Sequence, residues 1–456
     1  MQIQNAPRYD VIVVGGGLSG CAMATALADG SRKILVLEAR AGKNPRFNGE
    51  LIHPHGVDVL EARGFWDALK TAGGAEVRGF ACVQASGKTT RLPYDEIIGS
   101  RPHGFAIDHH ALVDTLRARM ACKAGIELRQ GERVTELVRD QERVIGVMTA
   151  SGPILAPLVI ACDGRHSKIR ALTEIPERAT LLSFTAAALL ENCPLPNPGY
   201  GHIFLGAWGP ILVYPISKSD ARTCIDLPCD MDKGKEAVIA RLRDSYAPHL
   251  PEAVRATLLR ALDNSGDIEV AANYAIYTDE CTVPGAALIG DAAGCSHPLT
   301  ATGMTIALND TQLLADALVT VDLHDRAAVD RALARYQIER YRFVRARELL
   351  ADALYEVFRG TEDGTRAIRD GIFRYWNDSV KARARSMALL SGHESRLPAF
   401  LREYLTVVRK STSSVLRGAV NEPSLAGRVR SMIGLGRKGW EKLGLVARGV
   451  REGSLR

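Results

Sequence analysis

The sequence has no uninterrupted run of about 18 apolar residues, the shortest length with which a helix spans a membrane. Residues 1–10 also lack the basic-then-apolar pattern of a secretory signal. Hydrophobic residues make up 46% and charged residues 24% of the chain, which is typical of a globular protein. We therefore expect a folded, cytoplasmic protein.

Motifs of several large enzyme classes are missing as well. The nine cysteines form no CxxC pairs and have no histidines at zinc-site spacing. An HExxH motif, a hydrolase-type Ser-His-Asp spacing and paired catalytic carboxylates are also absent. We predict reduced thiols and no metal site, and neither a hydrolase nor a metalloenzyme is indicated.

Positive charge is concentrated at one end of the chain. The net charge is +6, yet residues 401–456 hold 12 Lys and Arg against 4 Asp and Glu. A nucleic-acid partner is not expected, because such proteins spread basic and aromatic residues over a folded face. The basic segment also has apolar residues at helical spacing, which favours peripheral contact with an anionic membrane, on its inner face. Packing of a helix on its own protein explains the group Phe400, Leu401, Tyr404, Leu405 and Val408 equally well.

A strand, a glycine turn, a helix and a second strand are predicted over residues 9–38. The motif Gly15-x-Gly17-x-x-Gly20 follows an apolar strand, lets the chain turn sharply and brings backbone N–H groups close to a pyrophosphate. Glu38 ends the second strand, where a carboxylate accepts hydrogen bonds from a ribose. The whole unit predicts a dinucleotide site, and a tight structural turn is the alternative.

Two further motifs also follow apolar strands. The first is Asp163-Gly164-x-x-Ser167-x-x-Arg170, which a turn with an N-capping serine also explains. The second is Gly290-Asp291-x-x-Gly294, which continues through Pro298 to Gly303-Met304 and a helix. Here Asp291 is a candidate to bind polyol hydroxyls of a cofactor, with the helix N-terminus facing an electron-rich ring. The alternative is a proline-led loop without a ligand.

The order of these segments predicts an α/β fold: a Rossmann-like FAD-binding domain interrupted by a mixed β-sheet substrate domain, with a helical C-terminal region. The expected bounds are 1–78, 109–186 and 276–335 for the FAD-binding domain, 79–108 and 187–275 for the substrate domain, and 336–456 for the helical region with its basic tail.

Taken together, the three motifs resemble the class A, p-hydroxybenzoate hydroxylase-like FAD-dependent monooxygenases. Within that group the chain is most similar to the squalene epoxidases. The segments that carry this resemblance are Arg46-Phe47-Asn48-Gly49-Glu50-Leu51, His297-Pro298-Leu299-Thr300 with Gly303-Met304-Thr305, Ala353–Glu356 and Met387–Gly392.

The resemblance implies FAD as cofactor and a set of residues around it. Leu18 and Ser19 would follow the phosphates, Glu38 the adenosine ribose and Val134 the adenine. Arg46 and Met304 would lie beside the flavin, and Asp291 on the ribityl chain. The full implied set is Gly15, Gly17, Leu18, Ser19, Gly20, Glu38, Arg46, Val134, Asp163, Gly290, Asp291, Gly303 and Met304.

The departures from the family pattern concern the substrate side. His53-Pro54-His55-Gly56 stands where relatives usually have Gln-Pro-Gly-Gly, and Phe80 stands where an aromatic residue with a hydroxyl is usual. Both positions are linked to catalysis in the family, so a substrate other than squalene is favoured. His109 occupies the place of a flavin-contacting Arg, for which Arg117 is a candidate replacement.

His53 is a candidate catalytic residue because imidazole titrates near neutral pH, and a hydrogen-bonded structural histidine is the alternative. The predicted substrate pocket contains His53, Phe80, Tyr214 and Pro298.

The implied reaction is a monooxygenation. A flavin C4a-hydroperoxide, formed from reduced FAD and O2, would epoxidise or hydroxylate a lipophilic, prenylated or isoprenoid-like small molecule in an apolar pocket. NAD(P)H would supply the electrons, either directly or through a separate flavin reductase. The alternatives are hydroxylation of a phenol, quinolone or polyketide ring, reduction of a prenyl chain by FAD, and a flavin-bound protein without turnover.

Overall fold

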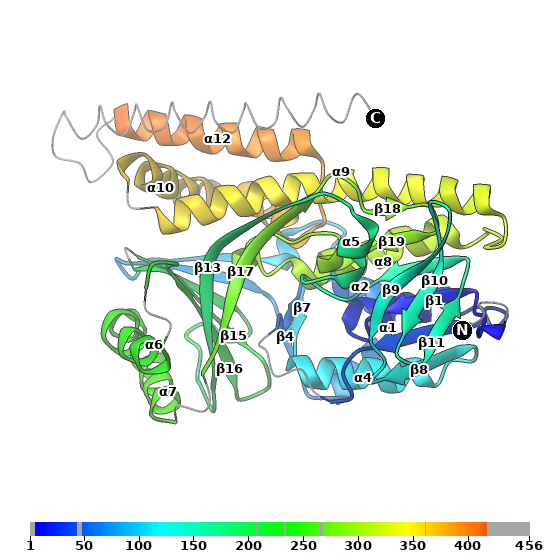
Figure 1. Cartoon of the computed structure of the whole chain (residues 1–456). Coiled ribbons are helices and arrows are strands. Elements are labelled where there is room, and N and C mark those ends of the chain that lie inside the picture. The colour runs from blue at the N-terminus through cyan, green and yellow to red at the C-terminus, as the bar shows by residue number, and fades with distance from the viewer. Residues whose placement is uncertain are drawn as a thin grey trace.

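A computed structural model describes residues 5–42, 48–206, 208–231, 234–264, 268–360 and 362–416. The molecule is built on two large sheets, and the long helix α9 (Arg326–Arg359) crosses both of them (Figure 1). The predicted fold class is confirmed, since a parallel nucleotide-type sheet, a second mixed sheet and a helical C-terminal region are all present. The domain bounds given above stay a prediction.

The first sheet has the strand order β18-β19-β12-β1-β2-β8. All strands except the edge strand β18 run parallel, and residues of β1, β12 and β19 are fully buried. Such strands must be covered on both faces, which is why they read as continuous apolar runs. Their bounds are β1 (Val11–Val14), β2 (Ile34–Glu38), β8 (Ile126–Gln130), β12 (Leu158–Ala161), β18 (Thr282–Val283) and β19 (Ala286–Leu288).

Helices and a small antiparallel sheet cover this core. Helix α1 packs on α4 and α8, and β10 packs on β12. The covering elements are α1 (Leu18–Leu27), α4 (His109–Ala121), α5 (Lys168–Thr173), α8 (Gly303–Leu318), β9 (Val134–Asp140), β10 (Arg143–Thr149) and β11 (Gly152–Leu155).

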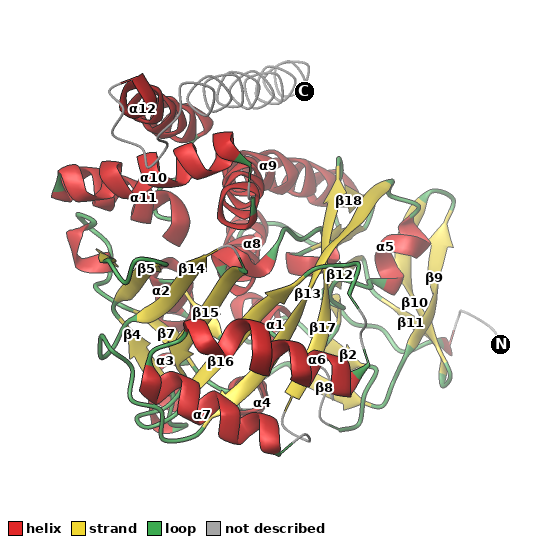
Figure 2. Cartoon of the chain, turned by 90° about the vertical axis from the view of Figure 1, so that its left-hand side faces the viewer, coloured by secondary structure: helices red, strands yellow, loops and turns green. Residues whose placement is uncertain are grey.

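The second sheet has the order β17-β13-β16-β15-β14-β5-β6, antiparallel except between β14 and β5. Its strands come from two separate stretches of the chain, so it interrupts the nucleotide-type part. Helices α6 (Lys235–Arg241) and α7 (Glu252–Asp263) cover one face (Figure 2). The strands are β5 (Gly79–Gln84), β6 (Thr89–Pro93), β13 (Glu177–Leu190), β14 (Gly201–Gly206), β15 (Gly209–Pro215), β16 (Ala221–Leu227) and β17 (Ile268–Thr278).

A third, three-stranded sheet has the order β3-β7-β4, and two helices, α2 and α3, lie between β3 and β4 in the sequence. Their bounds are β3 (Leu51–Ile52), α2 (Pro54–Ala62), α3 (Trp66–Thr71), β4 (Ala75–Val77) and β7 (Gly104–Ala106). Short 3-10 segments cover Tyr94–Glu96, Ala247–His249, Gly290–Ala292 and Pro298–Thr300, and a π-helical turn covers Leu242–Tyr246.

The C-terminal helices cover the other face of the second sheet. After α9 come α10 (Asp363–Asp378), α11 (Val380–Ser391) and α12 (Leu397–Leu416), and α12 packs on α10. Phe400 of α12 is buried whereas Leu405 is exposed, so part of the predicted apolar stripe serves the protein's own core. None of the helices in the described ranges is long and apolar enough to cross a bilayer. The rest of the basic tail, residues 417–456, lies outside the described residues, and its membrane contact stays a prediction.

A buried ion pair joins α8, α9 and the turn after β19. The carboxylate of Asp310 has no exposed surface and accepts hydrogen bonds from Arg340 Nε at 2.9 Å and from the Gly290 N–H at 2.9 Å. Burial raises the pKa of Asp310, and the guanidinium of Arg340 opposes that effect. The pair thereby fixes the position of Gly290 and its neighbour Asp291.

Arg340→Met is expected to destabilise the protein by about 3–5 kcal/mol, because it leaves the Asp310 carboxylate buried without a counter-charge. The double variant Asp310→Asn with Arg340→Met should lose less, since no unpaired charge remains and Asn can still accept from Gly290. Urea denaturation measures both. A single variant that is no less stable than the double variant would contradict this role for the ion pair.

Candidate functional site

The glycine turn between β1 and α1 is shaped by close backbone contacts. Gly15 has a φ of 107°, and a Cβ there would lie 2.3 Å from the Cys162 carbonyl oxygen. A Cβ on Gly20 would lie 1.8 Å from the Gly15 oxygen, so only glycine fits either position. Gly17 instead faces open space and begins α1 without a side-chain cap. The first N–H groups of α1, including those of Leu18 and Ser19, are therefore available to an anion.

Glu38 lies at the end of β2, next to this turn. Its Oε2 accepts hydrogen bonds from the Gly16 N–H at 3.0 Å and from the guanidinium of Arg117 at 3.1 Å. Arg117 Nε also donates to the Gly16 carbonyl at 2.7 Å. Arg117 therefore supports the glycine turn, and the flavin contact suggested for it stays a prediction. His109 Nδ1 lies 2.9 Å from the Gly49 carbonyl oxygen.

The second motif forms a turn stabilised by its own side chains. The carboxylate of Asp163 accepts from the Ser167 hydroxyl at 2.6 Å and from the N–H of Lys168 and Ile169. Arg170 is buried, binds the Ala292 carbonyl at 2.8 Å and pairs with Glu177. Since Ala292 follows Asp291, Arg170 ties the second motif to the third. The explanation of this motif as a turn with an N-capping serine therefore applies, because Ser167 caps α5.

Asp291 offers its carboxylate to the start of α8. Its carboxylate accepts no hydrogen bond from any described residue, and burial raises its pKa. A Cβ on Gly303 would lie 4.0 Å from Asp291 Oδ1, so this carboxylate faces the start of α8. Helix α8 begins at Gly303 without a side-chain cap, and Met304 lies against Gly49. This combination offers a carboxylate and free N–H groups to one ligand.

These motifs meet around one large cavity of about 870 Å³. Six of the predicted cofactor residues line it: Gly15, Gly17, Glu38, Val134, Asp163 and Asp291. Leu18, Ser19 and Gly20 lie in the first turn of α1, Gly290 directly precedes Asp291, and Gly303 with Met304 forms the first turn of α8. Arg46 lies outside the described residues.

The donor set fits a dinucleotide with a polyol chain. The space at Gly17 and the uncapped α1 suit phosphates, Glu38 suits a ribose, and the unbonded Asp291 carboxylate suits hydroxyl groups. FAD contains all three of these elements, which NAD shares only in part because it has no ribityl chain.

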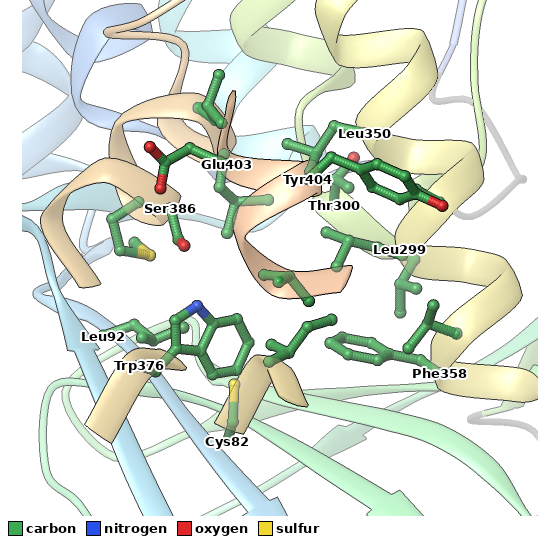
Figure 3. A pocket seen from close by; sticks show the side chains of 18 of the residues that line it. Cys82, Leu92, Leu299, Thr300, Leu350, Phe358, Trp376, Ser386, Glu403 and Tyr404 are labelled. Atoms are coloured by element: carbon green, nitrogen blue, oxygen red, sulfur yellow. The ribbon is translucent and has the colours of Figure 1, made fainter. Parts of the chain in front are cut away.

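A second, smaller pocket of about 100 Å³ lies between the second sheet and the C-terminal helices (Figure 3). Side chains of α9, α10, α11 and α12 line it together with residues of β5, β6 and β14. All of its lining side chains except Thr300, Ser386 and Glu403 are apolar or aromatic. Leu299 and Thr300 come from the loop that leads into α8, so this pocket borders the segment that connects Asp291 to Met304.

Of the four predicted pocket residues, Phe80 alone lines this apolar pocket. Tyr214 is buried behind it, where its hydroxyl donates to Glu50 at 3.0 Å. Pro298 is exposed, although the next two residues line the pocket. Tyr214 and Pro298 are predicted pocket residues, but the structure places neither of them in the wall of this pocket.

His53 is also absent from the pocket wall, and its surroundings argue against proton transfer. The ring is fully buried, with Nε2 2.9 Å from the Thr300 carbonyl oxygen and Nδ1 2.7 Å from the Tyr94 hydroxyl. Burial lowers the pKa of His53 to about 4, so the ring is neutral near pH 7. Neutral His53 donates to Thr300 and accepts from Tyr94. These contacts suit a residue that positions the loop at Thr300, and the catalytic role suggested for His53 stays a prediction.

A buried Ser-His-Asp cluster is present that the sequence spacing did not indicate. The Ser183 hydroxyl donates to Asp226 at 2.5 Å and lies 2.8 Å from His297 Nε2. His297 Nδ1 accepts from the Leu299 N–H, so Nε2 carries the proton and cannot accept one from Ser183. The cluster consequently holds the loop at Leu299 and is not a hydrolase triad. Its members are far apart in the sequence, which left no signal to find.

A buried salt bridge connects the second sheet to the segment before β3, beside Met304. Glu50 is 2% exposed and accepts from Arg222 through both oxygens, at 2.9 and 2.8 Å, as well as from Tyr214. Glu50 precedes β3 and Arg222 belongs to β16. The bridge therefore holds the second sheet against Gly49 and Glu50. Only the Glu50 half of this contact was visible as part of a motif.

His53→Gln is expected to flatten the loss of stability on acidification. The folded-state pKa of His53 is lowered, so its contribution is complete above the unfolded value of about 6.5 and is lost as the pH falls toward 4. Between pH 7 and pH 5 the wild type should lose about 2 kcal/mol more than His53→Gln, whose amide can replace both hydrogen bonds. Urea denaturation at the two pH values measures this, and equal losses would show that His53 is not a buried neutral ring.

Comparison with known proteins agrees with this geometry. The profile of the squalene epoxidase family matches residues 155–427, and that of an NAD(P)-binding Rossmann-like domain matches residues 13–67. Squalene epoxidase 3 of Arabidopsis thaliana is 31% identical over 417 residues, which cover 89% of this chain and 79% of that protein.

Solved structures of flavin enzymes share the fold. The p-nitrophenol 4-monooxygenase PnpA of Pseudomonas putida aligns with a TM-score of 0.72 and 18% identity, over 85% of this chain and all of that one. PqsL of Pseudomonas aeruginosa, a probable FAD-dependent monooxygenase, aligns with a TM-score of 0.67 and 22% identity, over 77% and 97%. The chain therefore belongs to the squalene epoxidase family and is a FAD-dependent monooxygenase.

Proposed function

We propose that this enzyme inserts one oxygen atom from O2 into a lipophilic, isoprenoid-like small molecule, by epoxidation or hydroxylation, with a reduced nicotinamide as the electron source. The observation that carries this proposal is the apolar pocket at Leu299 and Thr300, on the loop that leads to the cofactor cavity. Apolar walls favour a lipophilic acceptor and exclude water from the reaction. The squalene epoxidase relatives act on a substrate of this kind, as their names state.

FAD fits the residues of the larger cavity. We assign its phosphates to the start of α1, its adenosine ribose to Glu38, its ribityl hydroxyls to Asp291 and its ring to the start of α8 beside Met304. When bound and reduced, FAD supplies the activation of O2, with one oxygen atom going to the substrate and the other to water.

The protein's own part in the reaction is to hold the acceptor and keep water away. Phe80, Leu299 and Thr300 would face the substrate. The ionisable side chains among the described lining residues are the Glu403 carboxylate, the Tyr404 phenol and the Cys82 thiol. His53 and His297 fix the loop from both sides through Thr300 and Leu299. Electrons would arrive from NAD(P)H directly or through a separate flavin reductase.

Glu38→Ala and Asp291→Ala are each expected to weaken FAD binding about tenfold or more, since each removes a charge-assisted hydrogen bond to a ligand hydroxyl. The control is Asp67→Ala, which removes an acid that is 96% exposed on α3. Flavin fluorescence during titration of the apoprotein gives the dissociation constants. Unchanged binding in both acid variants would contradict the assignment of these residues.

Isotopically labelled O2 tests the reaction itself. The FAD-loaded enzyme is supplied with NADPH or NADH, with and without a general flavin reductase, and with a panel of isoprenoid and phenolic substrates. The expected product carries one labelled oxygen atom. A product that gains two hydrogen atoms and no oxygen would show a prenyl reductase, and a labelled phenol as the main product would show an aromatic hydroxylase.

A further inference from the structure

Three hydrogen-bonding groups lie together on one side of the apolar pocket. They belong to Glu403 of α12, Ser386 of α11 and Trp376 of α10, which all line it. Figure 3 shows the carboxylate of Glu403, the hydroxyl of Ser386 and the indole nitrogen of Trp376 on the same side of the pocket, with Leu299 and Phe358 on the other. On that other side the hydroxyls of Thr300 and Tyr404 lie among apolar side chains (Figure 3).

Two of these three groups are unpaired donors. The Ser386 hydroxyl and the Trp376 indole N–H have no hydrogen-bond partner among the described residues. Trp376 is 6% exposed and Ser386 is half-buried, and neither donor is among the buried side-chain atoms that lack a partner. A ligand that fills the pocket without accepting from them would leave two donors unpaired, which is costly.

Glu403 supplies the complementary acceptor. It is 5% exposed and accepts from the Tyr375 hydroxyl and from Arg402 Nε at 3.1 Å, and Arg385 lies 3.7 Å away. A carboxylate has about four acceptor positions, so Glu403 can take one more hydrogen bond. Because two arginines already balance its charge, a neutral donor suits it better than a cation.

A hydroxyl group matches this set, since its oxygen accepts hydrogen bonds and its hydrogen donates one. We propose that the pocket takes an apolar molecule with one hydroxyl group, which Trp376, Ser386 and Glu403 bind, in preference to a pure hydrocarbon such as squalene. This rests on the proposed function, in which the pocket holds the substrate. The oxygen atom is then inserted at the far end of the molecule, next to Leu299 and Thr300.

The test compares two probes that differ only in the hydroxyl: geraniol and the hydrocarbon with the same carbon skeleton. Each is titrated into the full-length, FAD-loaded enzyme in its oxidised state without a reductant, and the change in flavin absorbance or tryptophan fluorescence gives its dissociation constant. Geraniol is expected to bind about tenfold more tightly, because it pairs donors that the hydrocarbon leaves unpaired.

Matched variants separate the polar side from the general fit. Ser386→Ala and Trp376→Phe should each weaken geraniol binding about threefold to tenfold more than hydrocarbon binding, because only geraniol loses a hydrogen bond. Leu350→Val, which alters an apolar part of the wall, should weaken both probes equally.

Equal affinity for the two probes, equal effects of Ser386→Ala and Trp376→Phe on both, or binding of neither would overturn the proposal. No turnover occurs in these titrations, so their outcome is independent of the labelled-oxygen experiment. An enzyme that prefers geraniol but transfers no oxygen would refute the proposed function and not this inference. An enzyme that transfers oxygen but binds the hydrocarbon and the alcohol equally well would refute this inference and not the proposed function.

Discussion

The carboxylate of Asp310 is the constraint on which much of the site depends. It belongs to helix α8, has no solvent contact, and bonds to the turn after β19 and to helix α9. The Gly290 N–H and the Arg340 guanidinium both require this one acceptor. Through Gly290 it sets the place of Asp291, and through α8 it sets where the helix begins beside Gly49. The long helix α9 then carries part of the apolar pocket wall.

Much of the fold follows from local patterns in the sequence. The continuous apolar strands Val11–Val14 and Leu158–Ala161 predict a buried parallel sheet, and these strands do pair in parallel. Gly15 and Gly20 are recognisable because backbone atoms occupy the space of their missing side chains. Such features depend on near neighbours in the sequence. Gly15, Gly17, Glu38, Asp163 and Asp291, which belong to the motifs, line one cavity together with Val134, which only the family resemblance implied.

The remaining interactions depend on partners more than a hundred residues apart. Glu50 pairs with Arg222, Ser183 with His297, and His53 with Thr300. No spacing rule links such residues, so the burial and neutral state of His53 cannot be inferred from its neighbours in the chain. The layer that Tyr214 reaches is equally hidden, because alternation along a strand gives the face and not the depth of a side chain.

The salt bridge from Glu50 to Arg222 restricts movement between the second sheet and the segment before β3. Two charges in a bidentate contact, away from water, resist separation, so β16 is held to Glu50 beside Met304. Hinging between them would break this contact. A displacement of β16 would therefore be transmitted through this ion pair to Gly49 and to Met304, which lies against it at the start of α8.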